Sequence, residues 1–248
     1  AAGQAARPAS GGGASMAPRL QGRWRWIVAA LLGTVLLAWA FARWGTPWAA
    51  AQMARHAPLA WEQRVSSEAL AQLDAGGMLK PTALPPQRQA QLRAAFEALH
   101  AQMPPGLQPD PAYAPPLVLQ FPAGLGANAL ALPGGTLVLT DAMEALAQSE
   151  GLGDDALMGV LAHEAGHVLY RHGTRRIIEL GLLNGAMALA LGDVSGIVNT
   201  AGTLLAGLAY SRGHEREVDC FAIAFMQGVD QDMLSSLADF YDEEVETS

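Results

Sequence analysis

Two histidines in this sequence have the spacing of metal ligands. His163 and His167 are four positions apart in the run His-Glu-Ala-Gly-His, so on a helix both imidazoles face one side and can reach one ion. Glu164 lies about 100° around such a helix from His163, at the edge of that side. Neutral imidazoles bind Zn²⁺ at about 2.0–2.1 Å, and a carboxylate beside an open coordination position can act as a base. The spacing therefore predicts a zinc site with two histidine ligands and Glu164 as the catalytic base.

The residues around this run predict a largely buried helix. Apolar side chains fill residues 156–162 before the first histidine and residues 168–170 after the second. We expect Asp154 or Asp155 to cap the start of this helix and Gly173 to end it. The alternative is a surface helix that carries two histidines and a glutamate by chance. Unpaired imidazoles would be costly on a buried helix, which favours the metal site.

A third metal ligand is expected in the charged segment 211–219, which precedes another apolar helical run. Glu215 and Asp219 are four positions apart, so on a helix they share a face. One carboxylate can bind the metal while the other orients a ligand imidazole. His214 is the alternative third ligand, although it would point about 100° away from Glu215. We expect Arg216 and Glu217 to form an exposed, charged first turn.

Together these segments resemble metallopeptidase family forty-eight, which includes HtpX-like proteases, Ste-type CAAX proteases, and BepA-like and Oma-like enzymes. Residues 128–140 resemble the strand pair that precedes the zinc helix in that family. The resemblance implies a zinc-dependent peptidase with a gluzincin-type catalytic domain. It also implies the following roles: His163, His167 and Glu215 as zinc ligands, Glu164 as catalytic base, Asp219 as the carboxylate that orients a ligand, and Arg212 as a motif arginine near the site.

Two departures from the family pattern accompany this resemblance. Val218 stands where the family usually has alanine. The family also commonly carries a Ser-His-Pro segment after the third-ligand helix, and the sequence reaches Ser248 where such a segment could begin.

Composition indicates membrane contact and argues against nucleic-acid binding. Hydrophobic residues make up 51% of the 248 positions and charged residues only 15%. The formal net charge of −8 is the wrong sign for a phosphate-backbone partner. The single cysteine, Cys220, excludes an intramolecular disulfide and fits a packing role in an apolar helix.

The N-terminal region predicts a membrane anchor. Residues 1–22 are rich in alanine, glycine and serine and are expected to be a disordered tail. Residues 26–42 are an unbroken apolar run with tryptophans near both ends, which predicts a transmembrane helix over residues 24–44. Arginines at positions 7, 19, 23 and 25 outnumber those just after the run, which places the catalytic part across the membrane from the cytoplasm. The alternative is a signal peptide cleaved near Ala38-Trp-Ala40.

Between anchor and metal site, residues 45–116 are expected to be helical and irregular. Strands are predicted over residues 117–121, 127–132 and 136–140, with a turn at residues 133–135. This hairpin is either scaffold or an edge that pairs with an extended substrate, and both roles can hold together. We expect substrate contacts at five of its residues: Asn128, Ala129, Leu130, Gly134 and Gly135.

The stretch 177–210 is expected to form an apolar helical hairpin, broken at Gly192-Asp193. It would cover the active site or contact the bilayer. The predicted fold is thus α+β: a mostly helical zinc peptidase core over residues 117–248, with a small antiparallel sheet, behind an N-terminal transmembrane helix.

These features predict a membrane-anchored zinc endopeptidase that faces the periplasm from a bacterial inner membrane. The family resemblance implies unfolded or misassembled envelope proteins as substrates. A zinc-stabilised chaperone or adaptor that binds such clients without cleavage is the alternative, and the intact Glu164 favours the enzyme. The sequence indicates no particular oligomeric state.

Overall fold

The chain divides into two compact units in a computed structural model that describes residues 17–191 and 210–228. The first unit is Ala1–Gly45 and the second is Thr46–Ser248. Every catalytic or metal-binding residue expected from the sequence belongs to the second unit.

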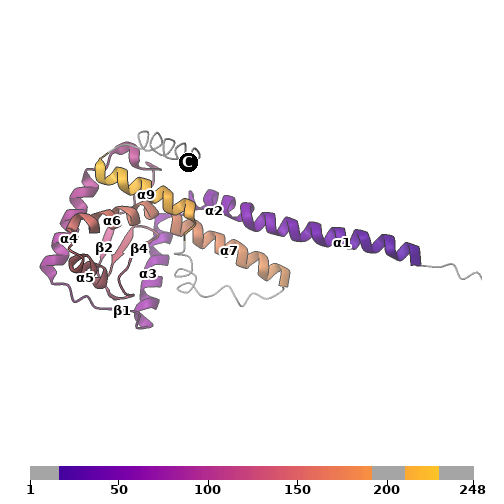
Figure 1. The fold of residues 1–248 in the computed structure, drawn as a ribbon, viewed down its shortest axis with the longest axis horizontal. Coiled ribbons are helices and arrows are strands. Elements are labelled where there is room, and N and C mark those ends of the chain that lie inside the picture. The colour runs from indigo at the N-terminus through magenta and orange to yellow at the C-terminus, as the bar shows by residue number, and fades with distance from the viewer. Residues whose placement is uncertain (1–16, 192–209, 229–248) are drawn as a thin grey trace, which may run out of the picture. The chain divides into compact units, whose positions relative to one another are not determined.

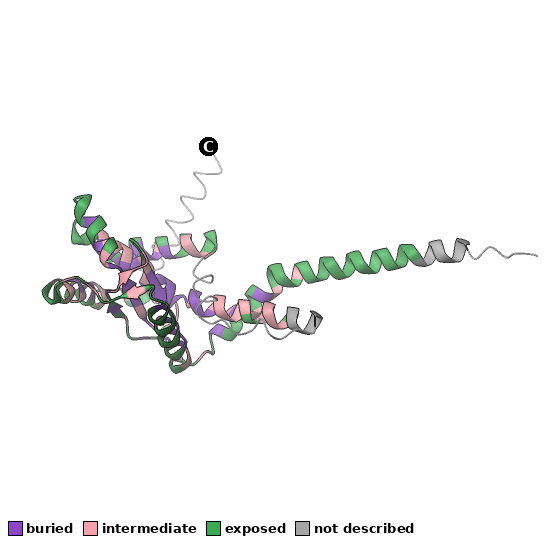
Figure 2. Cartoon of the chain, turned by 90° about the horizontal axis from the view of Figure 1, so that it is seen from below, coloured by how far each residue is buried: buried purple, intermediate pink, exposed green. Residues whose placement is uncertain are grey.

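The first unit is helical throughout its described part. It contains α1 (Ala17–Ala40) and a π-helical turn η1 (Phe41–Gly45). Nearly all of its described side chains are exposed, including large apolar ones such as Leu31 and Val35 (Figure 2). The 31 residues of Trp24–Ala54 form a helical segment long and apolar enough to cross a membrane, a test that a signal sequence also passes. Residues 17–22 were expected to belong to a disordered tail, but they are helical, because α1 begins at Ala17.

The second unit is mostly helical, as the sequence predicts. Its helices are α2 (Thr46–Ala54), α3 (Leu59–Ala75), α4 (Pro86–Ala101), a short 3₁₀ helix η2 (Pro105–Leu107), α5 (Asp141–Ser149), α6 (Asp154–Leu169), α7 (His172–Leu191) and α9 (Arg212–Gln227). Its strands are β1 (Leu79–Lys80), β2 (Val118–Gln120), β3 (Ala123–Gly124), β4 (Ala129–Leu132) and β5 (Thr136–Leu139). The three strands expected from the sequence correspond to β2, β4 and β5, each slightly shorter than predicted.

The sheets are small, and the larger one is mixed rather than wholly antiparallel. Strand β4 pairs antiparallel with β5, and β1 pairs antiparallel with β3. Strand β2 instead runs parallel to β5, in the order β2-β5-β4. The reason is the excursion through β3: the chain leaves the larger sheet after β2, pairs with β1, and returns before β4.

The larger sheet is packed on both faces. One face contacts the main core, where Ala131, Leu137 and Leu139 meet α6 residues such as Leu161 and Ala165. The other face places Leu130, Leu132 and Val138 against Val65 and Ala69 of α3. Helix α6 therefore lies on one side of the sheet and α3 on the other (Figure 1). Burial on both faces explains why β4 and β5 are almost continuously apolar.

Helix α6 begins and ends differently from the prediction. Its N-cap is Gly153, without a side-chain cap, while Asp154 lies in the first turn and binds Arg88 of α4. It ends at Leu169 rather than near Gly173. Arg171 then adopts a left-handed backbone conformation, with φ of 56°, and α7 starts at the next residue. The Arg171 side chain donates to the carbonyls of Ala54 and Ala57, which fixes this turn against the end of α2.

Helix α7 forms the first arm of the expected apolar hairpin. Its described side chains from residue 175 to residue 185 are mostly half-buried, and α2 packs along it (Figure 1). Among the described residues, Trp24–Ala54 is the one helix with the length and composition of a membrane span, so α7 does not meet that test. The predicted break at Gly192-Asp193 and the second arm lie outside the described residues.

Candidate metal centre

Helices α6 and α9 pack closely side by side and carry the predicted metal ligands (Figure 1). Gly166 permits this approach. A Cβ atom at this position would lie 3.0 Å from Phe221 and 3.1 Å from Val218, both fully buried residues of α9. The glycine within His-Glu-Ala-Gly-His therefore lets the third-ligand helix lie directly against the first. The valine that departs from the family pattern at position 218 fills this contact.

Three side chains converge with the geometry of a tetrahedral metal site. The ligand atoms of His163, His167 and Glu215 all lie within 4.8 Å of one another. The two Nε2 atoms are 3.2 Å apart, and Glu215 oxygens lie 3.3 Å from His163 Nε2 and 3.8 Å from His167 Nε2. Two ligands bound to one tetrahedral zinc ion are separated by about 3.3–3.4 Å. Two imidazole nitrogens and a carboxylate at these separations fit Zn²⁺.

Each of the two candidate ligand imidazoles is held from behind through its Nδ1 atom. His163 Nδ1 lies 2.9 Å from Asp219 Oδ1 on α9. His167 Nδ1 lies 3.0 Å from Nδ1 of His172, the first residue of α7. Both Nε2 atoms are thereby aimed at Glu215. Asp219 thus lies where the sequence predicts an orienting carboxylate, whereas His172 was not expected.

The side chain of Glu164 extends from α6 toward the edge strand of the sheet. Its carboxylate accepts a hydrogen bond from the backbone N–H of Ala131 in β4, the strand at the end of the three-stranded sheet. Burial, reinforced by the nearby Glu215 carboxylate, raises the pKa of Glu164 to about 7 despite that bond. A carboxylate with a pKa near neutrality is suited to take and return a proton.

Of the two histidines, His167 is the more deeply enclosed. Its ring stacks on Tyr210, with centroids 3.9 Å apart and planes 19° apart. Burial lowers the pKa of His167 to about 3, and the neighbouring imidazoles of His172, His163 and His214 add to the shift. The imidazole is therefore neutral at physiological pH, which is the form that binds metal.

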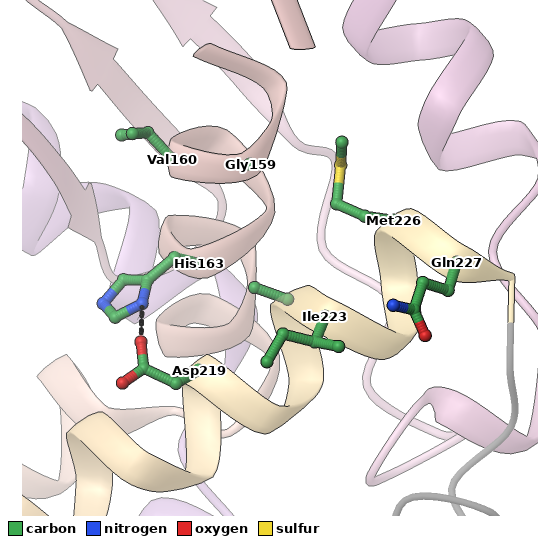
Figure 3. A pocket seen from close by; sticks show the side chains of 8 residues that line it. Gly159, Val160, His163, Asp219, Ile223, Met226 and Gln227 are labelled. Carbon is green, nitrogen blue, oxygen red and sulfur yellow. Dashed lines mark hydrogen bonds and ion pairs between the residues drawn. The ribbon is translucent and has the colours of Figure 1, made fainter. Parts of the chain in front are cut away.

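An apolar pocket lies beside His163. It has a volume of about 660 Å³ and is formed by the middle of α6 and the part of α9 from Asp219 to Gln227. Figure 3 shows the His163–Asp219 pair at one end and Ile223, Met226 and Gln227 of α9 along one side. Val160 and Gly159 contribute from α6. The pocket can accept an apolar side chain next to the metal ligands.

The remaining predicted residues of α9 have different positions. Ser211 caps the helix by accepting from the backbone N–H of His214. His214 itself stacks on His172, with centroids 4.2 Å apart, so the geometry favours Glu215 as third ligand. Arg212 is exposed, and within residues 17–191 and 210–228 it forms no ion pair with the site. Glu217 is exposed, as expected, and its carboxylate also lies 3.0 Å from His172 Nε2.

The five residues expected to contact substrate are separated by the fold. The backbone of Asn128 is bonded to Thr140, and the Leu130 side chain is buried toward α3. A Cβ at Gly134 would collide with Gln63 of α3, and one at Gly135 with the backbone of Pro116. Gly134 is therefore explained by close packing on α3, and Gly135 by close packing on the segment before β2. Of the five, only Ala129 has a backbone N–H and C=O that point, like those of Ala131, away from β5 and toward the open edge of β4.

Sequence reasoning missed three residues around His167. They are His172 on α7, Tyr210 just before the N-cap of α9, and Glu217 on α9. One available signal was that His172 follows the second ligand by five positions in a chain with only six histidines. A cluster of four of those histidines, carried by α6, α7 and α9, is more than one metal site requires.

Comparison with known protein families matches residues 86–247 to peptidase family M48, about two thirds of the 248-residue chain. The matched span runs from the start of α4 through α9 and includes all residues of the ligand group. No curated protein matches the chain.

Proposed function

Because the chain belongs to peptidase family M48, we propose that this metallopeptidase is a zinc-dependent endopeptidase, with His163, His167 and Glu215 as metal ligands. The observation that carries the proposal is the convergence of these three ligand atoms beside the half-buried Glu164 carboxylate. Zinc, when bound, supplies a Lewis acid that activates water and polarises a peptide carbonyl. The donor set and its spacing suit this ion.

Glu164 acts as the general base and acid. In its ionised form the carboxylate accepts a proton from the attacking water, and it then returns that proton to the leaving nitrogen of the cleaved bond. The backbone N–H of Ala131 holds the carboxylate in place during both transfers. A pKa near 7 allows both directions of transfer at neutral pH.

We propose that substrate binds as an extended strand along the open edge of β4. The backbone of Ala129 faces this edge, which is also the edge whose Ala131 amide holds Glu164. The apolar pocket beside His163 would accept a side chain near the scissile bond. Unfolded proteins expose both extended backbone and apolar side chains, so these features support a role in protein quality control.

The test of catalysis compares wild type with Glu164→Gln. The full chain is purified in detergent, its zinc content is measured, and cleavage of an unfolded protein such as casein is followed. We expect the variant to keep one zinc per chain and to lose activity by several orders of magnitude. Loss of the metal would contradict the assigned role of Glu164. Wild type that holds zinc and cleaves no unfolded protein would favour the chaperone or adaptor function instead.

The third ligand is tested by Glu215→Ala, with His214→Phe as the matched control one residue away. Removal of Glu215 should strip the zinc or weaken its binding sharply, because only two protein ligands remain. The control keeps an aromatic ring stacked beside His172 and should retain the metal. Zinc lost from the control and kept by Glu215→Ala would reverse the assignment.

We further propose that Trp24–Ala54 includes a single-pass anchor in a bacterial inner membrane, with the peptidase in the periplasm. The apolar helical segment and the arginines before it support this orientation. Alkaline phosphatase fused after Ser248 should be active, because it requires export. In the control, replacement of Arg19, Arg23 and Arg25 by glutamate should reduce that activity by removing the charge bias. An inactive wild-type fusion would contradict the periplasmic assignment, and a shortened mature protein would indicate a cleaved signal peptide.

A further inference from the structure

A buried histidine connects one metal ligand to a distant carboxylate. His172 is fully buried at the start of α7. Its Nδ1 lies 3.0 Å from His167 Nδ1, and its Nε2 lies 3.0 Å from Glu217 Oε2 on α9. The chain of contacts therefore runs from the ligand group through two imidazoles to a carboxylate at the protein surface.

The hydrogen positions in this chain follow from the ligand role of His167. Its Nε2 must be bare to bind a metal, so the neutral ring carries its hydrogen on Nδ1 and donates it to His172 Nδ1. His172 accepts at that atom, so its own hydrogen lies on Nε2 and is donated to Glu217. The carboxylate, which can only accept, selects this arrangement of both rings.

Packing prevents the rings from choosing another orientation. The His172 ring is stacked with two aromatic neighbours: Tyr170, with planes 18° apart, and His214, with planes 16° apart. The His167 ring is in turn stacked on Tyr210. Rotation of either imidazole would break a buried hydrogen bond as well as a stacking contact.

We propose that His172 and Glu217 are positioning residues, which fix the tautomer and ring orientation of the zinc ligand His167 through the His167–His172–Glu217 relay. The proposal rests on the proposed function, because it requires a metal at His167 Nε2. It assigns to His172 and Glu217 the task that Asp219 alone performs for His163.

The test measures zinc affinity of the full chain by competition with a chromophoric chelator. His172→Phe keeps a ring in the stack and removes the acceptor, and it should weaken zinc binding by about 10- to 100-fold. Glu217→Ala should weaken binding in the same direction by a smaller factor. His214→Phe, which alters the neighbouring ring outside the relay, should bind zinc as wild type does.

Two further readouts separate the relay from a general structural role. The double variant His172→Phe/Glu217→Ala should bind zinc no more weakly than His172→Phe, because Glu217 acts only through His172. The visible spectrum of the cobalt-substituted protein should change in His172→Phe and remain unchanged in His214→Phe. Additive losses in the double variant, or wild-type affinity in His172→Phe, would overturn the relay.

Folding and catalysis are monitored independently. If His172→Phe fails to fold, the proposal is tested on the Glu217→Ala variant, because Glu217 is exposed and its replacement should not disturb folding. Wild-type zinc affinity in that variant would overturn the proposal. A wild-type chain that binds no zinc would overturn both the relay and the endopeptidase function. If wild type binds zinc but cleaves nothing, the endopeptidase function alone is contradicted, and the same affinity series still decides on the relay.

Discussion

The two histidines proposed as metal ligands, His163 and His167, occupy opposite environments. The His163 side chain is 24% exposed and is oriented by Asp219, whose own side chain is 61% exposed. The His167 side chain is only 2% exposed and contacts the fully buried His172. Both imidazoles lie on α6, one turn apart, and face the same third ligand. The solvent side of the centre is thus built from a carboxylate, and the buried side from a neutral ring.

This difference teaches how an orienting hydrogen bond can be supplied inside a protein. A carboxylate at the position of His172 would have to be desolvated, which is costly without a paired cation. The neutral imidazole of His172 accepts the same hydrogen bond. It donates its own hydrogen to the negatively charged Glu217, whose side chain is 40% exposed. The charge therefore remains in water while the ligand remains buried.

The largest contrast is expected from removal of the two ligands themselves. His163→Ala and His167→Ala should both abolish tight zinc binding. In the metal-free protein, His167→Ala should lower the free energy of unfolding by about 2–4 kcal/mol, because it leaves a cavity and leaves the buried Nδ1 of His172 without its partner. His163→Ala should lower it by less than about 1 kcal/mol, because that side chain is partly solvated. Urea unfolding of both variants measures this, and equal losses would remove the distinction between the two sides.

A second contrast concerns pH and the carboxylate beside the buried ligand. Burial raises the pKa of Glu164 to about 7 from an ordinary value of 4.5, so the folded metal-free protein keeps a proton that the unfolded chain has lost. Its stability should therefore fall as pH rises through that window. Glu164→Gln cannot ionise, so above pH 7 it should be more stable than wild type by on the order of 1–3 kcal/mol. Below pH 4.5 the difference should vanish. Urea unfolding of both proteins at several pH values measures this, and a stability difference that stays constant with pH would contradict the raised pKa of Glu164.

On the solvent side, Asp219→Ala should weaken zinc binding by about 10- to 100-fold. The metal-free protein should unfold at nearly the wild-type urea concentration, because the side chain is exposed. Asp219→Asn retains an oxygen that can accept from His163 Nδ1 and should recover part of the affinity. Complete loss of zinc in Asp219→Ala would instead identify Asp219 as a ligand.

The smallest effect is expected at the ring stacked on the buried ligand. Within the described residues, the buried hydroxyl of Tyr210 has no hydrogen-bond partner. Tyr210→Phe should therefore change the free energy of unfolding by no more than about 0.5 kcal/mol and leave zinc affinity unchanged. Tyr210→Leu removes the stacked ring and should cost about 0.5–1.5 kcal/mol. Identical unfolding of the two variants would show that stacking contributes nothing to holding His167.

Helical periodicity accounts for the part of the site that the sequence could predict. His163 and His167 share one face of α6, and Glu215 and Asp219 share one face of α9. The residues of each pair are four positions apart, so the sequence alone predicts that they lie together. The relay to His172 escaped this reasoning because it crosses the junction between two helices. A helix end could be expected at a glycine, but a left-handed conformation at an arginine is uncommon and has no local sequence signal.

The direction of β2 was unpredictable for a related reason. Neighbouring strands joined by short segments usually pair antiparallel, and residues 121–128 are such a segment by length. They instead include β3, whose partner β1 lies more than forty positions earlier. Gly124 allows this pairing, because a Cβ there would collide with the carbonyl oxygen of Met78 at 2.1 Å. Local patterns identify strands, whereas pairing depends on contacts across the chain.

The left-handed turn at Arg171 sets a limit on transplanting this metal centre into another protein. On one uninterrupted helix, residues five apart point about 140° away from each other. His167 and His172 face each other only because α6 ends before Arg171 and α7 begins after it. A designer who copied residues 163–172 onto a straight helix would keep two ligands and the carboxylate, and would place His172 on the wrong face. The smallest portable unit is therefore α6, its turn and the start of α7, with α9 laid across them.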